Sequence, residues 1–120
     1  MKEDTNLAEA NLSSSDFSEC NFNGADLINA DLNSSEFFTA YFSCANLSGT
    51  NLKNASFNGA NFSQADLIGT ELGENSFNRA NFTDANLTGA KNINLNGAIV
   101  CNTIMPDGSV ITIRQTINEE

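Results

Sequence analysis

The chain has 120 residues, which fits one domain, and 40% of them are hydrophobic, so a disordered acidic tail is excluded. The formal net charge of −10 argues against direct nucleic-acid binding, because phosphates would be repelled. The chain contains no histidine, so a His-based triad or a histidine zinc site cannot form within it. We therefore expect no catalytic residue, no cofactor and no metal ion.

Residues 1–4 are a short N-terminal lead-in without the apolar segment of a secretory signal. No apolar run approaches the roughly 20 residues of a membrane span. Three cysteines without CxxC spacing indicate free thiols in a reducing compartment. We expect a cytoplasmic protein that does not insert into membranes.

A five-residue repeat begins at residue 5. From Leu7 to Leu87 every fifth residue is Leu or Phe, seventeen times in succession, and a small residue stands two positions before each. A period of five matches neither the 3.6-residue period of a helix nor the two-residue period of a strand. A chain that turns a corner after each short strand segment keeps all the Leu and Phe residues inside. The repeat therefore predicts an all-β solenoid.

The central residues follow the order Leu-Leu-Phe-Phe four times, so the full period is 20 residues and each coil has four sides. Like residues then stack in four interior columns, with coils about 4.8 Å apart. The predicted core comprises Leu7, Leu12, Phe17, Phe22, Leu27, Leu32, Phe37, Phe42, Leu47, Leu52, Phe57, Phe62, Leu67, Leu72, Phe77, Phe82, Leu87, Leu95, Val100 and Met105.

The corners show a preference for glycine. Six of the eight glycines occupy the last position of a unit, where a corner needs positive φ. Four units have a charged or amide residue in that position instead, namely Glu9, Gln64, Glu74 and Arg79. We therefore expect some corners to have ordinary backbone angles.

The register changes once, at residues 90–92, which act as a three-residue insertion before the pattern resumes at Leu95. Counted in this way, residues 5–107 form a parallel β-helix of about five coils. The only proline, Pro106, precedes Asp-Gly and a β-rich run, which indicates a turn into a terminal strand. Residues 108–120 are predicted to form a C-terminal capping strand and tail, because solenoids need caps.

The charges do not form one continuous acidic face. The net charge is −3, −3, +1, −3 and 0 for residues 5–24, 25–44, 45–64, 65–84 and 85–107. On the first side of the coils, acids alternate with Asn at the position before Leu, which keeps like charges about 9.6 Å apart. This pattern favours a solvated structural face over a surface that mimics DNA.

Four apolar residues fall at outward positions and form a possible partner surface: Ile28, Phe38, Tyr41 and Ile68. The outward Cys44 offers a redox role as an alternative. Unpaired strand edges at the ends of the rod also allow end-to-end association.

Units such as 25–29, 45–49 and 85–89 resemble the A-[DN]-[LF]-x-x signature of the pentapeptide-repeat family. The resemblance covers residues 5 to about 105 and implies a right-handed quadrilateral β-helix, with the handedness taken from the family. The segment 101–109 looks like the ending of many small cyanobacterial and plastid members, most of which have no assigned activity. The best understood members resemble duplex DNA and bind DNA gyrase.

Two functions from different classes remain open. The chain is interpreted as a noncatalytic structural or protein-interaction scaffold, a monomer or an end-to-end dimer, with an unknown protein partner. The alternative is a DNA-mimicking regulator that binds a topoisomerase such as gyrase, or another DNA-binding protein. An enzyme is a remote third interpretation, because the carboxylates point outward from a convex rod.

Overall fold

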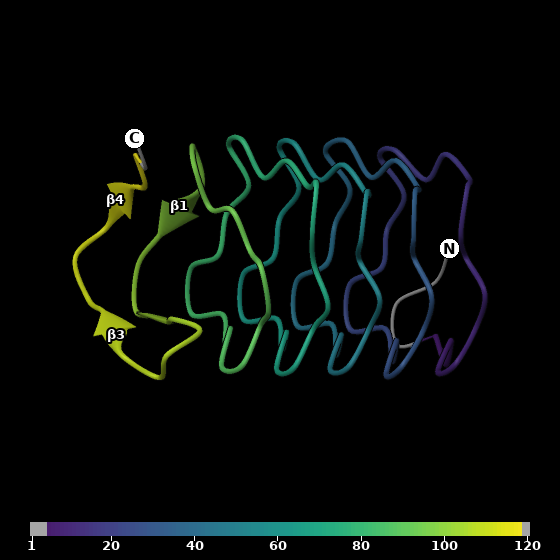
Figure 1. Cartoon of the computed structure of the whole chain (residues 1–120), viewed down its shortest axis with the longest axis horizontal. Coiled ribbons are helices and arrows are strands. Elements are labelled where there is room, and N and C mark those ends of the chain that lie inside the picture. The colour runs from purple at the N-terminus through teal and green to yellow at the C-terminus, as the bar shows by residue number, and fades with distance from the viewer. Residues whose placement is uncertain (1–4, 119–120) are drawn as a thin grey trace.

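In the computed structural model of the chain, which describes residues 5–118, the backbone winds into square coils stacked along one axis (Figure 1). The expected lead-in, residues 1–4, and the last two residues of the tail lie outside this description. Residues that are 20 positions apart pair in parallel, so that Asn6 pairs with Asp26 and Asp26 pairs with Asn46. The four-sided, all-β parallel helix predicted from the sequence is confirmed.

The backbone hydrogen bonds of one unit show why the chain can turn every five residues. Asn46 N–H donates to Ala25 of the preceding coil at 2.9 Å, and Leu47 N–H donates to Asp66 of the following coil at 2.7 Å. Gly49 N–H also reaches the following coil, and Thr50 N–H closes the turn onto the Leu47 carbonyl at 3.1 Å. Four of the five N–H groups are thus satisfied by backbone carbonyls.

The fifth N–H group of the unit is satisfied by a side chain. Ser48 N–H donates to Oδ1 of Asn46, two residues before it, at 3.1 Å. The same bond links Ile28 to Asp26 and Ser63 to Asn61. Asn and Asp recur before the central Leu or Phe because their short side chains carry an acceptor at this reach. The alternation of Asp and Asn therefore serves the backbone first, since either residue supplies the Oδ1 atom.

The last position of each unit has a left-handed backbone, whichever residue occupies it. Positive φ occurs at glycines such as Gly69 (68°), as expected. It also occurs at the four positions where ordinary angles were expected: Glu9 (62°), Gln64 (61°), Glu74 (58°) and Arg79 (64°). That expectation was wrong, because a turn closed between a central residue and the residue three positions later requires positive φ at its third residue.

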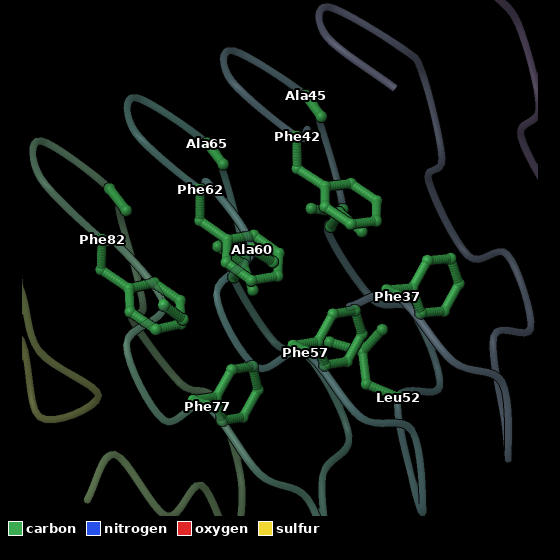
Figure 2. Close-up of a cluster of buried hydrophobic side chains, with 14 of the residues drawn as sticks. Phe37, Phe42, Ala45, Leu52, Phe57, Ala60, Phe62, Ala65, Phe77 and Phe82 are labelled. Atoms are coloured by element: carbon green, nitrogen blue, oxygen red, sulfur yellow. The ribbon is translucent and has the colours of Figure 1, made fainter. Parts of the chain in front are cut away.

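The core consists of interior columns of stacked side chains (Figure 2). The Phe37 and Phe57 rings lie 5.0 Å apart and almost parallel, as do those of Phe42 and Phe62 in the neighbouring column. Between the two columns the rings meet edge to face, with 5.3 Å and 63° between Phe57 and Phe62. Each ring thus combines stacked and T-shaped contacts, both of which aromatic pairs favour.

Most of the predicted core is fully buried. The exceptions are Leu7, Leu12, Phe17 and Met105, which are partly buried and pack against the buried cluster. All four belong to the first and last turns of the described stack. The small corner residues are buried with the core, and Ala25, Ala40 and Ala60 are no more than 1% exposed.

The register change in the last coil is a shortening, and the expected three-residue insertion at residues 90–92 was wrong. Lys91 still pairs with Glu71, 20 residues earlier, whereas Ile99 pairs with Asn81, only 18 residues earlier. The coil therefore loses two residues after Lys91. The chain turns early at Asn92, whose φ is 60°.

This shortening moves Leu95 from the second side of the coil to the third. Ala98 N–H donates to the Leu95 carbonyl at 2.9 Å, which repeats the turn between Ala80 and Phe77. The second side of this coil has no inward Leu of its own, and Ile93 packs against the core there, partly buried. Counting residues from the sequence could not distinguish a lengthened side from an abbreviated one.

The C-terminal cap consists of two short antiparallel ladders. Strand β1 (Ile99–Val100) pairs with β4 (Gln115–Thr116), and β2 (Thr103–Ile104) pairs with β3 (Val110–Ile111). The terminal segment thus crosses the end of the stack opposite the N-terminus (Figure 1). The predicted turn and terminal strand are confirmed, and the strand is interrupted between β3 and β4.

Gly69→Ala should destabilise the protein through the backbone alone. No atom lies within 4 Å of the added Cβ, so steric crowding by other residues is absent. Left-handed φ costs an Ala about 1 kcal/mol more than a Gly. Chemical denaturation should show this loss, and Gly69→Asn, which tolerates positive φ better, should lose less. Equal stability of the wild type and Gly69→Ala would contradict the assigned strain.

Asn61→Ala should cost about 1 kcal/mol, because the Ser63 N–H loses its acceptor. Asn61→Asp is the matched control, since it keeps an oxygen at the Oδ1 position, and it should retain most of the stability. The free energy of unfolding of the three proteins, measured at neutral pH, tests this role. If the Asp variant were destabilised as much as the Ala variant, the side-chain acceptor would not be the reason for the preference.

Candidate functional site

The four apolar residues of the expected partner surface do not form one surface. Phe38 (36% exposed) follows the third side of its coil, and Tyr41 (49% exposed) begins the fourth, so the two flank one corner. Ile28 is partly buried and Ile68 is 40% exposed, and both follow the first side, two coils apart. The first and third corners of a square coil are diagonally opposite. The corner with Phe38 and Tyr41 is therefore a separate candidate site.

Four residues form a column along this third corner. Glu19 N–H donates to the Phe38 carbonyl, Thr39 N–H to Asn58, Gly59 N–H to Asn78, and Arg79 N–H to Gly97, at 2.8–2.9 Å. The donors Glu19, Thr39, Gly59 and Arg79 occupy the left-handed position of successive coils, with φ between 55° and 72°. The column runs along the rod axis, with one residue per coil.

A groove of about 350 Å³ follows this column, and we call it the third-corner groove. Its lining residues are Phe38, Thr39, Asn58, Gly59, Asn78 and Arg79. Gly59, the residue without a side chain, occupies the middle of the column between Thr39 and Arg79. A Cβ atom at Gly59 would lie 3.0 Å from the Thr39 methyl group, so any side chain there would enter the groove.

The groove offers an apolar end and a cationic end. Phe38 exposes part of its ring at one end, beside the methyl group of Thr39. At the other end, within residues 5–118, the Arg79 guanidinium has no hydrogen-bond or ion-pair partner, and the Asn78 side-chain amide has no hydrogen-bond partner. Asn58 is already engaged, because its Oδ1 accepts the Asn78 N–H at 3.1 Å. Arg79 therefore remains available to an external acceptor.

Charges elsewhere on the rod are partly neutralised. On the second side, Lys53 and Lys91 both approach Glu71, at 3.9 and 3.5 Å, and the side chains are exposed. Exposed pairs of this kind contribute about 0–1 kcal/mol. On the third side, Asp16 pairs with Glu36 in the next coil, as the sequence predicted. The backbone N–H and the hydroxyl of Ser18 donate to Asp16 and lower the pKa of its carboxyl.

The cysteines lie apart from the groove. Cys44 is exposed, and its thiol donates to Oε1 of Gln64 at 3.0 Å. Cys20 is partly buried against the core, and the Cys101 thiol lies 3.6 Å from the Thr112 carbonyl. All three thiols are free. The redox role considered for Cys44 stays a hypothesis.

Within residues 5–118, no group of three or more Cys, Asp or Glu side chains is arranged to hold a metal ion. In the same part of the chain, no helix has the length and apolar character needed to cross a bilayer.

The sequence interpretation identified Phe38 but missed the other five residues of the groove. Thr39 and Arg79 were assigned only to corners, and Asn58 and Asn78 were ordinary polar positions of the repeat. A signal was present, however. Writing the sequence in rows of 20 places Gly59 between Thr39 and Arg79 in one column, which marks a missing side chain between two larger ones.

The family model described as pentapeptide repeats matches residues 5–43, 40–74 and 60–91. The structure is similar to a pentapeptide repeat protein from the cyanobacterium Cyanothece, with a TM-score of 0.61, 26% identity, and coverage of 90% of this chain and 88% of that one. No curated protein sequence matches the chain.

Two weaker structural similarities involve longer proteins. HetL, a pentapeptide repeat protein of Nostoc involved in regulating heterocyst differentiation, gives a TM-score of 0.38 at 22% identity, with coverage of 88% of this chain and 62% of that one. A pentapeptide repeat protein of the Arabidopsis thaliana thylakoid lumen gives a TM-score of 0.44 at 21% identity, with coverage of 78% and 67%. These similarities agree with the fold and carry no functional argument.

Proposed function

Because the chain belongs to the pentapeptide-repeat family, whose structures are right-handed quadrilateral β-helices, we propose that it is a noncatalytic scaffold that binds a protein partner. Family members are protein-interaction scaffolds and are generally noncatalytic. We place the partner on the third corner, at the groove and the adjacent Tyr41. The observation that carries this proposal is the groove over Gly59, flanked by an exposed aromatic ring and an unpaired guanidinium.

The composition of this corner supports an interaction role. Phe38 and Tyr41 stand at positions where most units carry small or polar residues, and both rings are partly exposed. Aromatic residues and Arg are enriched at the centres of protein interfaces, where they carry much of the binding energy. The core does not need these side chains, since it is complete with the inward Phe37 and Phe42.

We expect the scaffold to act in the cytoplasm as a monomer or an end-to-end dimer. Its three free thiols suit a reducing compartment.

A second candidate function is that of a DNA-mimicking regulator of gyrase or another DNA-binding protein. The net charge of −10 on a rod supports it. The distribution of the charges does not, because residues 45–64 contain no acid and Lys53 pairs with Glu71 of the next coil. A duplex carries phosphates at every step along its axis. We therefore rank this function below the scaffold.

Phe38→Ser and Tyr41→Ser should each weaken capture of a partner from the native cell without unfolding the rod. Phe38 and Tyr41 are solvent-exposed, and neither belongs to the buried core. Ile68→Ser on the first corner is the matched control, since Ile68 is exposed to a similar extent and should leave capture unchanged. Quantitative mass spectrometry of the captured proteins is the measurement. Equal capture by all variants would refute the assignment of the partner to the third corner.

Purified protein should leave the supercoiling activity of DNA gyrase unchanged at concentrations up to tens of micromolar. The expectation follows from the interrupted acidic surface. An agarose-gel supercoiling assay measures it, and the charge variant Lys53→Glu, which extends the acidic surface into the middle coil, shows whether added charge creates an effect. Dose-dependent inhibition by the wild-type protein would favour the DNA-mimicking function instead.

A further inference from the structure

We infer that the third-corner groove binds an extended polypeptide segment with a basic residue, an apolar or aromatic residue two positions later, and an acidic residue two positions after that. The inference rests on the proposed scaffold function and specifies the chemistry of its partner. Three observations lead to it: the order of charges along the column, the position of the gap at Gly59, and the spacing of the coils.

The column has a charge at each end and none between. Glu19 lies in the first coil, with Glu36 of the second coil on the same side of the rod, and both carboxylates are exposed. Thr39 and Gly59 follow without charge, and Arg79 ends the column in the fourth coil. The acidic end attracts a basic residue, and the guanidinium fits a carboxylate, which it can bind through two parallel hydrogen bonds.

The spacing of these groups matches that of an extended strand. Adjacent coils are about 4.8 Å apart, so Glu19 and Arg79, three coils apart, are separated by about 14 Å. In an extended chain, alternate residues face the same way, and a residue and the one four positions later are about 13–14 Å apart. The two end charges of the column therefore match two residues that a strand presents on one face.

The gap at Gly59 fits the middle residue of the same strand. A residue two positions from the basic one lies about 6.8 Å along the column, between Thr39 at about 4.8 Å and Gly59 at about 9.6 Å. There the groove is hollow, because Gly59 has no side chain, and Phe38 lines it. An apolar or aromatic side chain would bury its surface against the Phe38 ring at this point.

The test is a titration of the 15N-labelled full chain with a blocked peptide, Gly-Lys-Ser-Phe-Ser-Glu-Gly, at low ionic strength. We expect saturable shifts of the backbone amides of Glu19, Thr39, Gly59 and Arg79. Replacing the Phe of the peptide by Ser should weaken binding at least tenfold. Absence of saturable shifts at these four residues would overturn the inference, as would shifts centred on another corner.

Two sets of variants probe the contacts. Arg79→Glu should weaken binding of this peptide about tenfold, because an exposed attraction is replaced by repulsion. The peptide Gly-Lys-Ser-Phe-Ser-Lys-Gly, which binds the wild type poorly, should bind Arg79→Glu with restored affinity. Gly59→Asn fills the hollow with a residue that tolerates positive φ, and should abolish the shifts. Gly69→Asn is the same change at the same position of the first side, and should leave them intact.

An unchanged affinity of Arg79→Glu, or an equal effect of the two Asn variants, would overturn the inference. The outcome is distinguishable from failure of the proposed function. If Phe38→Ser abolishes capture of a cellular partner while the peptide gives no shifts, the scaffold function stands and the sequence pattern inferred for its partner is wrong. If the peptide binds as expected while capture is unaffected by Phe38→Ser, the groove binds such segments and the cellular partner uses another surface.

Discussion

The hydrogen bond from a backbone N–H to the side chain two residues before it holds this fold in its five-residue rhythm. Four N–H groups of a unit find carbonyl partners in the stack, but the first residue of the turn points its N–H along the outer surface, where no carbonyl reaches it. An Asn or Asp supplies the acceptor in most units, as Asn46 does for Ser48. The cost of an unsatisfied backbone donor is thereby avoided at each corner.

This requirement also explains where the surface is free to vary. Tyr41 occupies an Asn position, yet the N–H of Ser43 is not lost, because Asn23 of the preceding coil donates its Oδ1 as acceptor at 2.8 Å. Phe38 likewise has its N–H bound by the Ser18 hydroxyl at 3.2 Å, although the unit has Glu36 in place of Asn or Asp. In these two units the preceding coil supports the backbone. The exposed aromatic ring of Tyr41 thus follows from a substitution that the neighbouring coil makes affordable.

The core and the coil number followed directly from the sequence, because period and side-chain type are repeated at every level. A Leu or Phe at every fifth position can be buried only if the chain turns, and Leu-Leu-Phe-Phe fixes four turns per coil. The left-handed corners were less accessible, since Arg79 and Glu74 are poor indicators of positive φ. The shortened coil was misjudged because a Leu at position 95 fits two sides equally well until its hydrogen bonds are known. The groove was missed because its six residues come from three coils.

A convex rod with a filled interior has few ways to make a binding site, and removal of a side chain is the simplest. The corners of this chain project outward in columns, and each residue of a column stands directly over its neighbour. A glycine in such a column leaves a hollow whose walls are the two residues above and below it. Gly69 and Gly89 are adjacent in their column, so neither has large walls, whereas Gly59 lies between Thr39 and Arg79. Glycine thus meets the conformational demand of the turn everywhere, and only where its neighbours are large does it also create a site.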